Sequence, residues 1–105
     1  MIDWNRVAEL KEEIGTEGFA EVVELFLAEV EQELDRLGDT CHADALEAKM
    51  HFLKGSALNL GLGDLSRLCQ SGEAAAAKGD TGALDLGRIR ACFTASRDSL
   101  LQNLK

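Results

Sequence analysis

Hydrophobic residues recur every three or four positions along most of the chain, which is the spacing of one face of an α-helix. Glycines interrupt this pattern near residues 15, 38, 61–63 and 79–82, and they divide the chain into five predicted helices. These helices cover approximately residues 3–14, 17–37, 43–60, 64–78 and 83–104. No stretch has the period of a β-strand, and no internal repeat or low-complexity linker interrupts the series.

Each predicted helix carries one apolar stripe that we expect to face a shared core. The stripes consist of Trp4, Val7, Leu10 and Ile14; of Phe19, Val22, Phe26, Val30, Leu34 and Leu37; of Leu46, Met50, Leu53, Ala57 and Leu60; of Leu65, Leu68, Cys69, Gly72 and Ala76; and of Leu86, Ile89, Phe93, Ser96 and Leu100. Four long amphipathic helices with short loops predict an all-α fold, an antiparallel four-helix bundle whose short additional N-terminal helix caps one end. A length of 105 residues, 46% of them hydrophobic, predicts one domain over residues 1–105.

Composition and charge narrow the classes of function. The chain has 19 acidic and 11 basic residues and a formal net charge of −8. This balance disfavours binding to nucleic acid or to anionic membranes, because both attract basic surfaces. No apolar run approaches the roughly 20 residues of a membrane span, and the N-terminus lacks the features of a signal peptide. We therefore expect a cytoplasmic protein.

The cysteines do not predict a metal site or a disulfide framework, because Cys41, Cys69 and Cys92 are far apart and form no CxxC pair. Cys69 and Cys92 fall on apolar stripes, so we interpret them as small core residues. Cys41 and His42 are adjacent potential ligands without a partner set, which makes a poor metal site. A cofactor-binding helical bundle needs inward-facing His and Glu pairs, and the core stripes contain none.

The segment KMHFLKGSALNLGLG, residues 49–63, contains an unusual group of residues for a helix. At about 100° per residue, His51 points roughly 140° away from the centre of its apolar stripe and therefore toward solvent. Lys54 and Gly55 follow it by one turn, and Leu58 points in nearly the same direction. A glycine inside a helix costs about 1 kcal/mol relative to alanine, so Gly55 requires an explanation.

The chemistry of these positions suits phosphoryl transfer. An imidazole is partly neutral near pH 7, so His51 can act as a nucleophile. The product would carry about two negative charges, to which Lys54 can offer a charge-assisted hydrogen bond. Gly55 would leave room for the phosphoryl group or for a partner. Considered singly, the histidine and the lysine are ordinary surface residues, and Gly55 would suit a close helix contact if it pointed inward.

The segment HFLKGSALNLG resembles the core motif of histidine-containing phosphotransfer (HPt) domains. That motif contains a histidine, any residue, Leu-Lys-Gly, small residues, and then a hydrophobic residue and Gly. The matching positions are His51, Leu53, Lys54, Gly55, Ser56, Leu60 and Gly61. The segments EGFAEVVELFLAEVEQEL and LGLGDLSRLCQSGEAAAAKGD are similar to the preceding and following helices of that family, so the resemblance covers nearly the whole chain.

The resemblance implies a four-helix-bundle relay module of multistep two-component signalling. It implies that His51 is phosphorylated, on Nε2, that Lys54 stabilises the phosphoryl group and that Gly55 provides clearance. The expected partners are receiver domains of a hybrid histidine kinase and of a response regulator, which would themselves supply Mg²⁺. The chain contains no nucleotide-binding motif, so we expect a phosphoryl carrier with no cofactor of its own rather than an enzyme.

Four further residues are predicted to take part in docking, namely Leu58, Asn59, Gln70 and Glu73. Glu73 falls where relatives often place a polar residue that contacts the histidine, and some members have glutamine there. A carboxylate at this position would favour a charged imidazolium but would repel a phosphoryl group.

Two other interpretations remain open from the sequence. A non-catalytic helical adaptor, derived from a degenerate phosphotransfer module, would bind a signalling partner through the same face. The histidine-bearing module of a chemotaxis-type kinase would also look similar, although long kinase domains normally follow that module and this sequence ends at Lys105. We expect a stand-alone monomer, because the face around His51 has to stay free.

Overall fold

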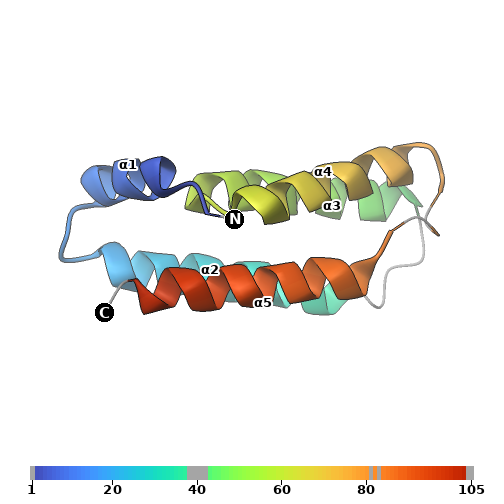
Figure 1. The fold of residues 1–105 in the computed structure, drawn as a ribbon. Helices are drawn as coiled ribbons and strands as arrows, with labels where there is room; N and C mark the ends of the chain where they lie inside the picture. The colour runs from blue at the N-terminus through green and yellow to red at the C-terminus, as the bar shows by residue number, and fades with distance from the viewer. Residues whose placement is uncertain (1, 38–42, 81, 83, 104–105) are drawn as a thin grey trace.

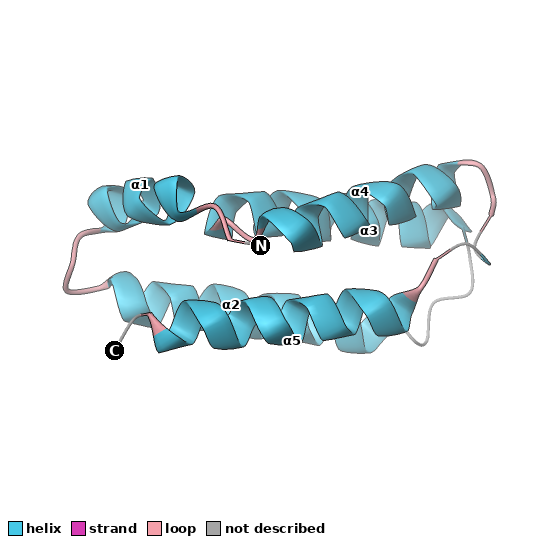
Figure 2. Ribbon diagram, viewed as in Figure 1, coloured by secondary structure: helices cyan, strands magenta, loops and turns pink. Residues whose placement is uncertain are grey.

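The computed structural model describes residues 2–37, 43–80, 82 and 84–103. Its helices are α1 (Trp4–Ile14), α2 (Phe19–Leu37), α3 (Ala43–Leu60), α4 (Gly63–Ala77) and α5 (Leu86–Gln102) (Figure 1). Within these ranges the chain forms helices and turns and no strand (Figure 2). Helices α2 to α5 run alternately in opposite directions along an elongated body of 43 × 22 × 20 Å. The prediction of an all-α antiparallel bundle is therefore confirmed.

The helix boundaries follow local capping chemistry. The side chain of Asp3 accepts a hydrogen bond from the backbone N–H of Arg6 at 3.3 Å and caps the start of α1. Asp85 accepts in the same way from the N–H of Arg88 at 3.0 Å, so α5 begins at Leu86, three residues later than predicted. Such caps stabilise a helix start because they satisfy a backbone N–H that has no partner within the helix.

The core stripe of α3 agrees with its prediction, because all five predicted residues are buried. The stripe of α2 was predicted wrongly at two positions. Val23 and Leu27 are buried, whereas Val22 and Phe26 are only partly covered. Helix α2 packs against both α3 and α5, so its buried face lies between the two neighbours and is rotated from the stripe chosen by spacing alone.

Several predicted core residues lie at the margin of the core. Trp4 is exposed, and Ile14, Leu68, Leu86 and Cys92 are partly buried. These residues sit near helix ends or on flanks that no neighbouring helix covers completely. None of the helices within the described ranges is both long and apolar enough to cross a membrane.

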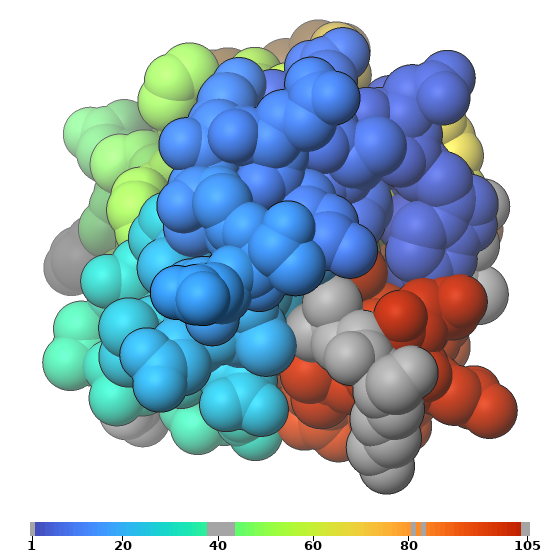
Figure 3. Space-filling model, turned by 90° about the vertical axis from the view of Figure 1, so that its left-hand side faces the viewer, coloured from blue at the N-terminus to red at the C-terminus, as the bar shows by residue number. Residues whose placement is uncertain are grey.

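Helix α1 caps one end of the bundle, beyond the end of α3 and α4 (Figures 1 and 3). The backbone N–H of Asp3 donates to the carbonyl of Gly61 at 2.6 Å. Gly61 has a φ of +78°, and a Cβ there would lie 2.7 Å from the backbone oxygen of Asp3. Only glycine combines that conformation with so close an approach. The turn between α3 and α4 therefore forms the docking point of α1.

Helices α3 and α4 pack closely, and this packing positions the residues around His51. A Cβ added to Gly72 of α4 would lie 2.8 Å from Sδ of Met50, and Met50 is completely buried. The missing side chain lets the two helices approach each other. Met50 immediately precedes His51, and Gly72 immediately precedes Glu73.

Candidate functional site

His51 lies in the middle of α3 with 70% of its side chain exposed. Its neighbours Met50 and Leu53 are completely buried and anchor this part of the helix in the core. The backbone under the histidine is therefore rigid, whereas its ring is open to solvent. The outward direction predicted from helical spacing is confirmed.

Glu73 of α4 connects the two residues that the sequence motif brings together. Its Oε2 lies 2.6 Å from Nδ1 of His51, and its Oε1 accepts a hydrogen bond from Nζ of Lys54, also at 2.6 Å. The side chains of Lys54 and Glu73 are 24% and 20% exposed, so both are partly sheltered by the helices. One carboxylate thus contacts both His51 and Lys54.

These contacts control the charge of Glu73. The hydrogen bond from Lys54 lowers the pKa of the Glu73 carboxyl below its usual range, and the hydrogen bond with His51 lowers it further. Partial desolvation acts in the opposite direction and is outweighed. Glu73 is consequently ionised at neutral pH, and an ionised carboxylate can only accept hydrogen bonds.

An acceptor at 2.6 Å determines which nitrogen of a neutral His51 ring carries the proton. Nδ1 must be the donor to Glu73, so Nε2 carries the free lone pair. Nδ1 faces the carboxylate of α4, and 70% of the His51 side chain, which includes Nε2, is exposed. In the neutral form of the ring, the arrangement therefore directs the lone pair of Nε2 away from Glu73.

Gly55 is exposed one turn after His51, and a Cβ at this position would meet nothing within 4 Å. The helix does not use this glycine for packing or for a left-handed conformation. Its cost in helix propensity therefore has no explanation within the described residues. A requirement for open space outside the helix is consistent with this finding.

The surface around His51 contains two exposed large apolar side chains, Leu58 at 57% and Phe52 at 46%. Leu58 was predicted as a docking residue, whereas Phe52 was missed. Its position directly after His51 and outside the apolar stripe is the signal that would have identified it. Gln70 is exposed on α4, on the same helix as Glu73.

Asn59, another predicted docking residue, is exposed but already has a partner. Arg6 of α1 donates from Nε to the backbone oxygen of Asn59 at 3.1 Å and from Nη2 to its Oδ1 at 3.3 Å. These bonds join α1 to the last turn of α3. The contacts of Asn59 therefore help to hold α1 in place.

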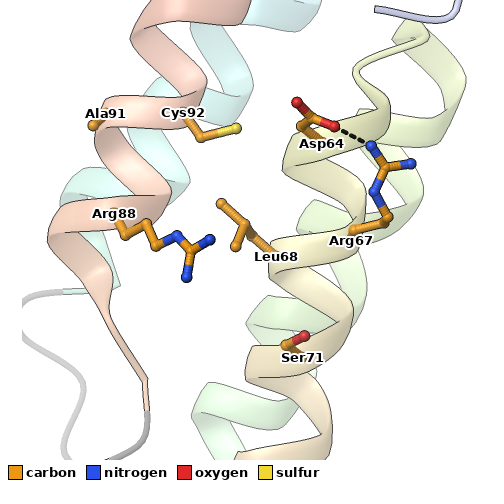
Figure 4. A pocket seen from close by; sticks show the side chains of 7 residues that line it. All are labelled: Asp64, Arg67, Leu68, Ser71, Arg88, Ala91 and Cys92. Carbon is orange, nitrogen blue, oxygen red and sulfur yellow. Dashed lines mark hydrogen bonds and ion pairs between the residues drawn. The ribbon is translucent and has the colours of Figure 1, made fainter. Parts of the chain in front are cut away.

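Two of the three cysteines, Cys69 and Cys92, lie within the described residues. Cys41 and His42 lie outside the described residues. Cys69 is buried as predicted, and burial raises the pKa of its thiol to about 12. Cys92 lines a groove of about 540 Å³ between α4 and α5, where it and Leu68 point into the gap (Figure 4). Within the described part of the chain, no cluster of three potential metal ligands occurs.

The described helices form a bundle in which the exposed ring of His51 contacts a carboxylate of the neighbouring helix. The family model of the Hpt domain matches residues 21–102, so the chain belongs to the Hpt family. Hpt domains are phosphocarrier modules of two-component signalling rather than classical enzymes, and they interact with receiver domains of kinases and response regulators. No curated protein and no solved structure matches the chain. Helix α1 precedes the matched region.

Proposed function

We propose that this protein is a phosphorelay intermediate. His51 accepts a phosphoryl group from the aspartyl phosphate of one receiver domain and passes it to an aspartate of a second receiver domain. The observation that carries this proposal is the exposed side chain of a histidine whose Nδ1 lies 2.6 Å from a carboxylate. The relay acts in the cytoplasm as a monomer, so that the face around His51 stays free.

In the first transfer, the lone pair of Nε2 attacks the phosphorus of the aspartyl phosphate in line. The Nε2–P bond forms, the acyl O–P bond breaks, and the receiver's aspartate leaves as a carboxylate. The receiver supplies Mg²⁺ and most of the electrostatic stabilisation, as is general in phosphoryl transfer. Lys54 has three ammonium N–H groups, and one of them donates a hydrogen bond to Glu73. The other protons can hydrogen-bond to a phosphoryl oxygen beside it.

Docking relies on the open and apolar surface around His51. The absence of a side chain at Gly55 lets the receiver approach the ring closely, and Phe52 and Leu58 provide apolar contact. Gln70 contributes to a polar rim. A patch of this size supports the weak and transient encounter that a relay requires, because a carrier has to leave one partner before it meets the next.

The test is transfer of labelled phosphate from a receiver domain phosphorylated on its aspartate, in the presence of Mg²⁺. Wild type should acquire acid-labile, base-stable label, and His51→Gln should acquire none. His42→Gln is the control and should be labelled like wild type. Label that persists in His51→Gln would show that another residue is the nucleophile. No transfer from a broad panel of receivers would favour the adaptor interpretation.

A further inference from the structure

The contact between Nδ1 of His51 and Glu73 has a consequence for the phosphorylated state, and not only for the free nucleophile. In the free ring, Nδ1 carries a proton and donates a hydrogen bond to the carboxylate, whose Oε2 lies 2.6 Å away. Phosphorylation of Nε2 leaves Nδ1 where it is, facing the same carboxylate. The ring then carries substituents on both nitrogens and a positive charge.

We propose that Glu73 keeps the Nδ1 proton on the phosphorylated ring at neutral pH, so that phosphorylated His51 remains a good donor for onward transfer. This inference rests on the proposed function. It assigns Glu73 as a positioning residue that acts through the imidazole and does not touch the phosphorus. The geometric basis is the short contact of the partly sheltered Glu73 carboxylate with Nδ1, while the reacting nitrogen is Nε2.

The proton balance of the relay shows why this matters. When Nε2 attacks, no proton leaves, and the ring becomes a phosphoimidazolium with Nδ1–H intact. When an acceptor carboxylate attacks the phosphorus, the N–P bond breaks and its electron pair returns to Nε2. The leaving group is then a neutral imidazole that still has Nδ1–H. Neither step requires a proton from water.

Loss of the Nδ1 proton would change the leaving group. Cleavage of the N–P bond in a neutral phosphoimidazole would expel an imidazolate anion, which is a far poorer leaving group. Such a species would store the phosphoryl group instead of passing it on. A carboxylate within hydrogen-bonding distance opposes this loss, because an opposite charge stabilises the charged form of its neighbour.

The charges on α3 and α4 near the ring are few. Lys54 lies one turn after His51 and is bound to Glu73, and Glu47 lies one turn before His51. On α4, the residue one turn before Glu73 is the uncharged Gln70. The positive charge of Lys54 disfavours a cationic ring. The negative charge of Glu73 opposes this effect and favours the cationic ring.

The other helices packed against α3 place their charges elsewhere. Glu33 of α2 is paired with Lys49 at 3.3 Å, on the flank of α3 that faces α2. Arg6 of α1 is bound to Asn59, two helical turns after His51. Among the described residues, Glu73 is thus the carboxylate within hydrogen-bonding distance of Nδ1.

The test compares phosphorylated wild type with phosphorylated Glu73→Gln. Both proteins are labelled with phosphoramidate, a small donor to imidazole nitrogen that needs no partner protein. ³¹P and ring ¹⁵N NMR then follow the pH at which the phosphorylated ring loses its Nδ1 proton. Glutamine can still accept a hydrogen bond but has no charge. We expect this midpoint to fall by about one pH unit in Glu73→Gln, the lower end of the range for a close charge.

Glu47→Gln is the matched control, because it removes a carboxylate from the same side of α3 without removing a hydrogen bond to the ring. Its midpoint should remain close to that of wild type. Equal midpoints in wild type and Glu73→Gln would overturn the inference, and so would an equal fall in Glu47→Gln. Failure of phosphoramidate to label either protein would contradict an accessible Nε2 and overturn both proposals. Label from phosphoramidate but from no receiver would contradict the relay alone.

Discussion

Gly55 offers a test in which stability and function should change in opposite directions. A Cβ at this position meets nothing within 4 Å, and the residue lies inside α3. Gly55→Ala should therefore stabilise the fold by about 0.5–1 kcal/mol, because alanine loses less backbone entropy in a helix. For a chain of this size, that gain corresponds to a melting temperature raised by about 2–8 °C.

The same position should tolerate no bulk during docking. Gly55→Leu keeps a good helix former but fills the space beside His51. Forced repacking of the interface at about 1–3 kcal/mol should slow transfer from a receiver about fivefold or more. Labelling by phosphoramidate, which needs little room, should change far less. Gly87→Ala is the control and should leave transfer unchanged, because Gly87 is exposed on α5. Normal transfer by Gly55→Leu, or a destabilised Gly55→Ala, would refute the clearance argument.

Two further predictions concern α1 and the apolar patch. Gly61→Ala should cost at least about 1–3 kcal/mol in urea unfolding, since it adds a close contact with Asp3 to an unfavourable φ. Gly79 has a similar φ of +76° but lies in open space, so Gly79→Ala measures the cost of the backbone conformation alone. Equal losses of stability in Gly61→Ala and Gly79→Ala would show that the contact with Asp3 is unimportant. Phe52→Ser should slow transfer from a receiver while its stability stays within about 0.5 kcal/mol of wild type. Leu25→Ser, which replaces an exposed residue of α2, should leave both the transfer rate and the stability close to those of wild type. A similar slowing of transfer in Leu25→Ser would argue against a local docking patch.

The spacing of apolar residues was sufficient to predict the helices and the bundle, because each long helix buries one face. The buried face of α2 was predicted less well, since its direction depends on two neighbours that spacing along one helix does not reveal. The contact of Glu73 with His51 could be expected only from the resemblance to the family, because spacing along one helix does not show which residues of another helix lie beside it. Residues 51 and 73 meet only because α3 and α4 pack in one register, which involves the close contact of Gly72 with Met50. Phe52 was missed because it points about 100° away from His51 around the helix, whereas Leu58 was found because it points in nearly the same direction as His51.

The pairing of Lys54 with Glu73 affects how strongly the carrier stabilises its own phosphorylated state. An interaction that stabilises the phosphorylated histidine more than the transition state lowers the energy of the intermediate and slows its departure. Lys54 and Glu73 carry one positive and one negative charge, so together they add no net charge beside the ring. Under the proposed function, the large stabilising charges come from the receiver and its Mg²⁺, which leave with each partner. We therefore expect the barrier to be lowered in both transfers, while the carrier itself provides the docking surface, the hydrogen bonds of Lys54 and a nucleophile with its proton in the correct place.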